Sequence, residues 1–380
     1  MGTTERTAPM TAKETRNKQR VLLVFAFLQA KAQEKQRRRR ELSDIVRSCG
    51  GEVVDCSEQN LLRFHPATLI GKGKVEEIAG FVQENDIDLV VFEQELSGAQ
   101  RFHLSERIPC RVLDRVDLIL DIFALRAQTK KAKVDVELAQ LAYRLPNLRG
   151  YGKALSRTGG GIGTRGPGEQ KLETDRRSIE KRMKRLREQR VRISAQERES
   201  GKRRYVSPYP IVGLVGYTNA GKSTIMNGLL SAFGKKEKAV YADDRLFATL
   251  DVSMRRIAET GKQTYLLADT IGFIHDLPER LSDPFAATLE EIRHCDLLLH
   301  VVDVAEEGAL ERIKTVQKSI QSAQADVPVL YVLNKIDQGD DRVMTPPDST
   351  IRLSARRKED ILHLQECILN RLAEKLGEVT

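Results

Sequence analysis

The chain has 380 residues, of which 40% are hydrophobic and 31% are charged, and it carries a formal net charge of +9 at pH 7. This length predicts two or three compact domains, and no apolar run is long enough to cross a bilayer. The five cysteines are scattered and lack the paired spacing of a zinc site. The positive charge favours a polyanionic partner, because each Lys or Arg beside a phosphate releases a condensed counterion.

Residues 1–19 form a polar tail, and residues 20–125 follow as a predicted N-terminal domain. The tail lacks the apolar core and cleavage site of a secretory signal. Beyond it, short β-branched runs at 21–27, 52–56 and 88–92 alternate with helical patterns at 34–48 and 74–85. This alternation predicts a small parallel α/β domain.

Residues 126–205 are predicted to form a long helical hairpin. Apolar residues recur there at spacings of three and four, at Leu138, Leu141, Leu145 and Leu148 and again at Ile179, Met183 and Leu186. Two long helices are therefore expected. Between them, residues 159–168 read GGGIGTRGPG, and six glycines in ten residues are incompatible with a continuous helix. The hairpin should have this glycine-rich loop at its tip.

The second arm of the hairpin is strongly basic. Residues 176–204 hold 13 Lys and Arg against 4 Asp and Glu. Such a run is usually a solvated helix face, but this excess is too large for i,i+4 ion pairs to absorb. We therefore favour contact with RNA. The neighbouring loop could be a flexible linker, yet Ile162, Arg165 and Pro167 are unlike a featureless spacer.

Residues 206–380 again alternate strand and helix patterns. Apolar strands are expected at 210–215, 264–268, 297–302 and 327–333. The pattern GxxxxGK[ST] follows the first strand and precedes a helix, as its phosphate-binding role requires. Its backbone N–H groups would wrap the β-phosphate. The phosphate-loop candidates are Gly216, Tyr217, Thr218, Asn219, Ala220, Gly221, Lys222, Ser223 and Thr224.

A magnesium site is predicted beside this loop. Lys222 would neutralise the β- and γ-phosphate oxygens, while Ser223 would offer its hydroxyl to Mg²⁺. Asp269 follows an apolar strand and would hold the metal through water, with the Gly272 amide near the γ-phosphate. Thr249 lies between these motifs and would complete the metal shell.

The sequence Asn334-Lys335-Ile336-Asp337 ends another apolar strand and predicts the base pocket. The Asp337 carboxylate would accept from guanine N1–H and N2–H₂, a donor pair that adenine lacks. Ser354 and Ala355 follow a short strand at 350–353 and would support the guanine O6. Residues 206–380 are therefore predicted to form a Ras-like P-loop GTPase domain.

Phe273 stands where many GTPases have a glutamine that orients the attacking water. Intrinsic hydrolysis should therefore be slow, and a partner or another element should complete the site. Asn219 is a candidate to help hold a monovalent cation such as K⁺; the alternative is an asparagine that bonds only its own loop.

Motifs outside the GTPase pattern resemble those of the HflX family, in the Obg/HflX class of translation-associated GTPases. They include residues 67–75 (ATLIGKGKV), 117–123 (DLILDIF), 159–169 (GGGIGTRGPGE), 172–177 (LETDRR), 247–251 (FATLD) and 269–274 (DTIGFI). The resemblance covers roughly residues 20–375, and the TRGPGE loop is its most specific part.

The resemblance implies a GTPase that binds the large ribosomal subunit and splits stalled or idle ribosomes under stress. GTP would favour binding and hydrolysis would favour release. We expect a cytoplasmic monomer that associates peripherally with ribosomes or membranes. The rRNA-contact candidates on the hairpin are Arg157, Gly159, Gly160, Gly161, Gly163, Arg165, Gly166, Gly168, Arg176 and Arg177.

Two alternatives stay open. The protein could be a GTP-regulated switch for a protein partner, with the N-terminal domain as docking surface, or a ribosome-assembly factor.

Some family members are credited with ATP use by the N-terminal domain. Residues 71–74 (GKGK) lack the GxxxxGK[ST] spacing, so a turn and a helix start are the better interpretation of that segment.

Overall fold

A computed structural model of the chain describes residues 18–156, 167–201, 208–234, 253–269, 292–305, 308–322, 326–338 and 350–377. The chain forms two compact units. One consists of Met1–Asp121 with Pro146–Thr174, and the other of Ile122–Leu145 with Asp175–Thr380. The division into three domains with boundaries near residues 126 and 206 stays a prediction. Within the described residues, no helix is both long enough and apolar enough to cross a membrane.

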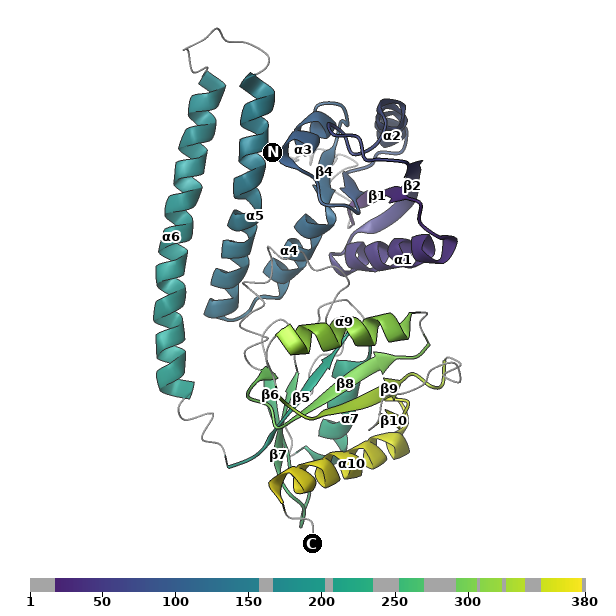
Figure 1. Ribbon diagram of the computed structural model, residues 1–380, viewed down its shortest axis with the longest axis vertical. Coiled ribbons are helices and arrows are strands. Elements are labelled where there is room, and N and C mark those ends of the chain that lie inside the picture. The colour runs from purple at the N-terminus through teal and green to yellow at the C-terminus, as the bar shows by residue number, and fades with distance from the viewer. Residues whose placement is uncertain are drawn as a thin grey trace, which may run out of the picture. The chain divides into compact units, whose positions relative to one another are not determined.

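The first unit contains a four-stranded sheet in the order β2-β1-β3-β4, and all of its strand pairs are parallel. Its strands are β1 (Arg20–Leu28), β2 (Glu52–Leu61), β3 (Leu89–Phe92) and β4 (Arg111–Asp114), and its helices are α1 (Ala32–Ser48), α2 (Lys72–Glu84) and α3 (Gly98–Ser105) (Figure 1). Residues 21–27 of β1 are all buried, as expected for a strand covered on both faces. The predicted parallel α/β fold is confirmed. α4 (Arg115–Arg126) follows β4 directly.

Two long helices follow, α5 (Lys130–Ser156) and α6 (Pro167–Gly201). Val134 and Leu138 of α5 pack with Met183 and Leu186 of α6, so the predicted apolar stripes do meet. α6 begins at Pro167, so the last two residues of the predicted loop 159–168 belong to the helix instead. The reason is that proline suits the first helical position, where no N–H partner is needed. Residues 157–166 lie outside the described residues.

The second unit contains a six-stranded sheet in the order β10-β9-β8-β5-β7-β6. Its strands are β5 (Ile211–Gly216), β6 (Ser253–Ile257), β7 (Tyr265–Asp269), β8 (Leu297–Asp303), β9 (Val329–Asn334) and β10 (Thr350–Arg352), and its helices are α7 (Lys222–Phe233), α9 (Ala309–Ser322) and α10 (Lys358–Leu376). The strand pairs are parallel except that β6 runs antiparallel to β7 at one edge. The sequence had not predicted this edge strand.

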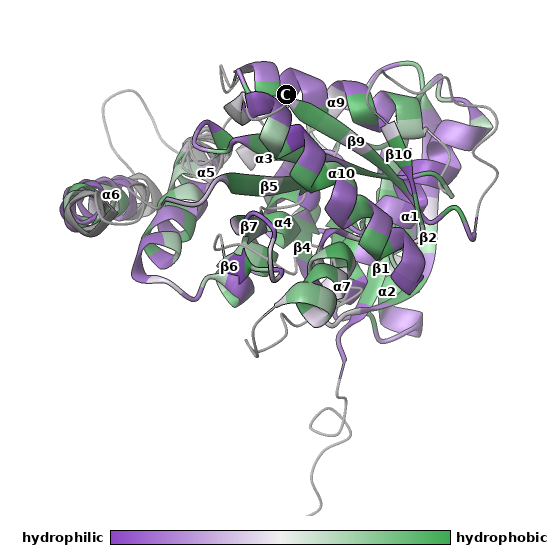
Figure 2. Cartoon of the chain, turned by 90° about the horizontal axis from the view of Figure 1, so that it is seen from below, coloured by the Kyte–Doolittle hydropathy of each residue, from purple (hydrophilic) through white to green (hydrophobic). Residues whose placement is uncertain are grey.

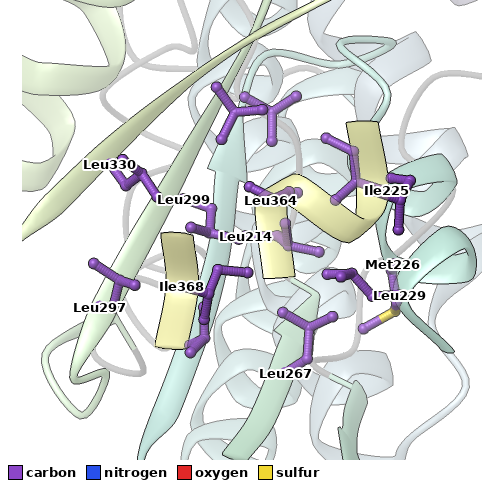
Figure 3. Packing of buried hydrophobic residues seen from close by; sticks show 14 of the residues in the cluster. Leu214, Ile225, Met226, Leu229, Leu267, Leu297, Leu299, Leu330, Leu364 and Ile368 are labelled. Carbon is purple, nitrogen blue, oxygen red and sulfur yellow. The ribbon is translucent and has the colours of Figure 1, made fainter. Parts of the chain in front are cut away.

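The core of this sheet is formed by the apolar strand runs that the sequence predicts. α7 and α10 cover one face and α9 covers the other (Figure 1). Leu214 and Leu267 of the strands meet Met226 of α7 and Leu364 of α10 in one buried cluster (Figure 3). In Figure 2, β5 and β9 are coloured as hydrophobic along their length, whereas α10 alternates between polar and apolar residues. Since β5, β7, β8 and β9 are parallel, their carboxyl ends meet at one edge of the sheet.

Candidate nucleotide-binding site

The loop between β5 and α7 has a backbone that requires glycine at two points. Gly216 has φ +148° and Gly221 has φ +97°. A Cβ at Gly216 would lie less than 3.0 Å from the Val301 carbonyl oxygen, and one at Gly221 less than 3.0 Å from Asn334 Nδ2. The loop is therefore packed closely against the ends of β8 and β9. Asn219 also has a positive φ, +63°, and is exposed.

Lys222 is the first residue of α7, and its side chain folds back into the loop. Its Nζ donates to the carbonyl oxygens of Gly216 at 3.0 Å and Tyr217 at 2.8 Å. Burial lowers the pKa of Lys222 to about 8, an effect that the Asp269 carboxylate opposes. The ammonium is thus held inside the loop, where it can be offered to an anion that the loop encloses.

Ser223 and Asp269 bring two oxygen ligands together beside the loop. The Ser223 Oγ lies 3.4 Å from Asp269 Oδ2, and the Asp269 carboxylate is fully buried at the end of β7. Hydroxyl and carboxylate oxygens are the ligands that Mg²⁺ prefers, with its remaining positions filled by water and phosphate. This pair therefore fits a nucleotide-bound Mg²⁺. Thr249, Gly272 and Phe273 lie outside the described residues.

Asn334 joins three segments of the site. It is buried at the end of β9, and its Nδ2 donates to the Ala220 carbonyl at 2.8 Å. Its Oδ1 accepts from the Ala355 N–H at 2.9 Å. The sequence had assigned Asn334 to base selection. The structure adds that this side chain fixes the phosphate loop to the segment after β10.

Asp337 and Ser354 are brought together although they are distant in the sequence. A hydrogen bond with the Ser354 side chain lowers the pKa of Asp337, assisted by Arg356 and Arg357. The carboxylate is therefore charged at neutral pH. Ser354 is itself buried, and its N–H donates to Asp360 Oδ2 at 2.7 Å.

Three residues of this unit were missed by the sequence analysis. Asp303, at the end of β8, forms an ion pair with Lys335, with 2.7 Å between Asp303 Oδ2 and Lys335 Nζ. Lys335 has a left-handed backbone with φ +66°. His300 of β8 is buried and is affected by the charge of Lys222, and Arg312 of α9 is buried against the Tyr217 ring. Asp303 could have been found, because it follows an apolar strand as Asp269 does. No sequence signal distinguishes Arg312.

The hairpin residues proposed for RNA are only partly described. Arg176 and Arg177 lie on α6, and Arg176 pairs with Glu180 at 3.2 Å. Gly168 is within the first turn of α6. The other candidates, Arg157, Gly159, Gly160, Gly161, Gly163, Arg165 and Gly166, lie outside the described residues.

A mostly parallel sheet with a lysine-bearing loop at the end of β5 and a buried carboxylate at the end of β7 is typical of P-loop nucleotide hydrolases, and the motif at residues 334–337 favours guanine among their substrates. Three family descriptions match the chain: "GTP-binding GTPase N-terminal" at residues 36–124, "GTP-binding GTPase Middle Region" at 126–204, and "50S ribosome-binding GTPase" at 211–335. The chain belongs to the HflX family of GTPases, because curated HflX relatives are 40–41% identical to it over most of its length.

Curated relatives support this assignment over most of the chain. GTPase HflX of Caldanaerobacter subterraneus subsp. tengcongensis is 41% identical over 366 residues, which cover 96% of this chain and 83% of the relative. GTPase HflX of Escherichia coli K12 is 40% identical over 370 residues, with 95% and 84% covered. A GTP-binding protein from Sulfolobus solfataricus, solved in complex with GDP, shares the fold with a TM-score of 0.52, at 20% identity over 94% of this chain and 99% of that protein.

Proposed function

We propose that this GTPase binds the large ribosomal subunit in its GTP form, splits stalled or idle ribosomes, and times its own release by GTP hydrolysis. The observation that carries the ribosomal part is the basic surface of α6. Lys181, Lys184, Arg185 and Arg187 are all exposed along it. A row of exposed cations on a long helix suits the phosphates of RNA. The description "50S ribosome-binding GTPase" for residues 211–335 supports the same partner.

For the nucleotide, we propose that the loop from Gly216 to Thr224 binds the phosphates. Ser223 and Thr249 would ligate Mg²⁺ directly, and Asp269 would do so through water. The guanine base would be held by Asn334, Lys335, Asp337, Ser354 and Ala355. With Phe273 after Gly272, intrinsic hydrolysis should be slow, and bound ribosomal particles would accelerate it. Asn219 is our candidate for a K⁺ ligand; equal hydrolysis rates in K⁺ and Na⁺ would argue against that role.

Base selection is tested by the Asp337→Asn variant. Guanine N2–H₂ needs an acceptor, whereas the xanthine base presents an oxygen at that position, which an amide N–H can meet. The variant should therefore lose affinity for GTP and gain affinity for XTP. Unchanged GTP affinity would remove Asp337 from the base pocket.

The ribosomal role is tested by sedimentation of whole ribosomes with GTP, a non-hydrolysable GTP analogue or GDP. Splitting is expected with GTP and with the analogue but not with GDP, and the analogue should leave the protein on the large subunit. Purified large subunits should also accelerate GTP hydrolysis. Absence of both effects would contradict the proposal.

A charge-reversal pair tests whether α6 makes the contact. Lys181→Glu with Lys184→Glu should weaken subunit binding and make the loss of binding with rising salt less steep, because fewer counterions are released. The matched control is Lys314→Glu with Lys358→Glu, which makes the same charge change at exposed positions on α9 and α10. Equal loss in both pairs would indicate a general charge effect. Binding that resists salt would instead favour a protein partner.

A further inference from the structure

Arg312 of α9 is a buried cation beside the phosphate loop. Only 8% of the residue is exposed, and its guanidinium carbon lies 4.9 Å from the centre of the Tyr217 ring. Tyr217 is itself 8% exposed. A buried guanidinium is costly unless its charge is compensated, and the face of an aromatic ring provides part of that compensation. The Arg312 side chain is therefore held against the Tyr217 ring by the packing of the fold, unlike a solvent-exposed side chain.

Tyr217 is central to the loop that Arg312 contacts. Its carbonyl oxygen accepts from Lys222 Nζ at 2.8 Å and from the Ala220 N–H at 3.3 Å. The ring and this carbonyl belong to the same residue, so packing that holds the ring also restricts the backbone that positions the carbonyl.

α9 is a firm support for Arg312. Its Ile313 and Val316 are buried against strands of the sheet, and Gln317 Nε2 donates to the Tyr331 hydroxyl of β9 at 2.7 Å. The N–H of Arg312 donates to the Gly308 carbonyl at 3.2 Å, in the first turn of the helix. The guanidinium is thus anchored to the sheet through its helix, while the loop that it contacts carries the phosphate-binding groups.

We infer that Arg312 is a positioning residue for nucleotide binding, which holds Tyr217 and with it the phosphate loop in the conformation that receives a nucleoside di- or triphosphate. Its positive charge also adds to the potential that attracts the phosphates. The inference rests on the proposed function of this loop. Because Arg312 contacts the phosphate half of the site, the affinity for phosphates should depend on it, but the choice of base should not.

The test compares Arg312→Gln with Arg312→Lys, since lysine keeps the cation and glutamine does not. Dissociation constants for GDP and IDP would be measured on the full chain, together with the midpoint of thermal unfolding. Arg312→Gln should weaken GDP binding by about three- to thirtyfold, and Arg312→Lys should recover most of that loss. The ratio of the GDP and IDP constants should stay at its wild-type value. Lys314→Gln, an exposed change of the same charge on α9, is the control and should leave GDP binding unchanged.

A double-mutant cycle with Tyr217→Leu tests the contact itself. If Arg312 acts through the ring, the double variant Arg312→Gln/Tyr217→Leu should bind GDP no more weakly than the worse of the two single variants. Should Arg312→Gln fail to fold, Tyr217→Leu and Arg312→Lys still test the same contact. Additive losses, a changed GDP-to-IDP ratio, or a lowered unfolding midpoint with wild-type GDP affinity would each overturn the inference. A wild-type protein that binds no GDP would overturn the proposed function instead.

Discussion

The substitution Gly221→Ala acts where the phosphate loop meets the base motif. Gly221 has φ +97°, and a Cβ there would lie less than 3.0 Å from Asn334 Nδ2. That nitrogen donates to the Ala220 carbonyl at 2.8 Å in the buried interior of the site. The added methyl group must therefore displace either the loop or the Asn334 side chain.

The cost has two separable parts. A left-handed backbone costs a residue with a Cβ about 1–2 kcal/mol. Loss of the Asn334–Ala220 hydrogen bond, with its groups left buried and unpaired, adds about 1–3 kcal/mol. We expect the free energy of unfolding to fall by about 2–5 kcal/mol in total. If about 2 kcal/mol of this falls on the loop conformation that binds phosphate, the Kd for GDP rises roughly thirtyfold.

Gly261→Ala is the matched control for this experiment. Gly261 also has a positive φ, +78°, but a Cβ there would have no heavy atom within 4 Å. It therefore carries the backbone cost alone, about 1–2 kcal/mol, and GDP affinity should not change. Urea unfolding and GDP titration of both variants provide the comparison. Equal effects on stability and on Kd in the two variants would refute the argument from steric overlap at Asn334.

Three further outcomes follow from titratable and apolar groups of the second unit. Since burial lowers the pKa of Lys222 to about 8 and a bound phosphate favours its charged form, GDP binding should take up protons at about pH 8.5 and none at about pH 6.5. Calorimetry in buffers of different ionisation enthalpy measures this uptake, and none at the higher pH would exclude the shifted lysine. Burial, and then the charge of Lys222, lowers the pKa of His300 to about 3. The unfolded state therefore binds this proton first, and the free energy of unfolding should fall by on the order of 4 kcal/mol between about pH 6.5 and pH 3. In His300→Leu, urea unfolding across that range should lose this slope, and an unchanged slope would assign it to other groups. Leu186 is only 1% exposed, so Leu186→Ala should destabilise the packing of α5 on α6 by about 2–4 kcal/mol, which would be measured as faster amide exchange in these helices. Val191 is 68% exposed, so Val191→Ala should change the exchange rates little. Equal exchange rates in these two variants would contradict the packing of α5 on α6.

The strands and motif positions were accessible from the sequence because their signals are local. The apolar runs that became β5, β7, β8 and β9 were each placed within a few residues of their ends. Phosphate-loop glycines and the carboxylate of Asp269 were found at strand ends for the same reason, since spacing alone locates them. The start of α6 was placed less well, since the helix begins at Pro167, inside the segment that its glycine content had assigned to a loop.

Strand pairings and contacts between segments far apart in the chain could not be predicted from these local patterns. The edge strand β6 runs antiparallel because of its partner and not because of its own pattern. Asn334 bonds Ala220 across 114 residues of sequence, and Arg312 meets Tyr217 through the packing of α9 on the sheet. A pattern of residue types carries no information about which side chain lies opposite another after such crossovers.

The sequence alone predicted the chemistry of the site, because the proposed phosphate loop, metal ligand and base motif each occupy a few consecutive residues. The tertiary structure decided how these groups support one another. It buried Lys222 and so shifted its pKa, fixed the loop through Asn334, and placed Arg312 against Tyr217. Those effects depend on burial and on distances between atoms, which arise only when strands far apart in the chain lie side by side.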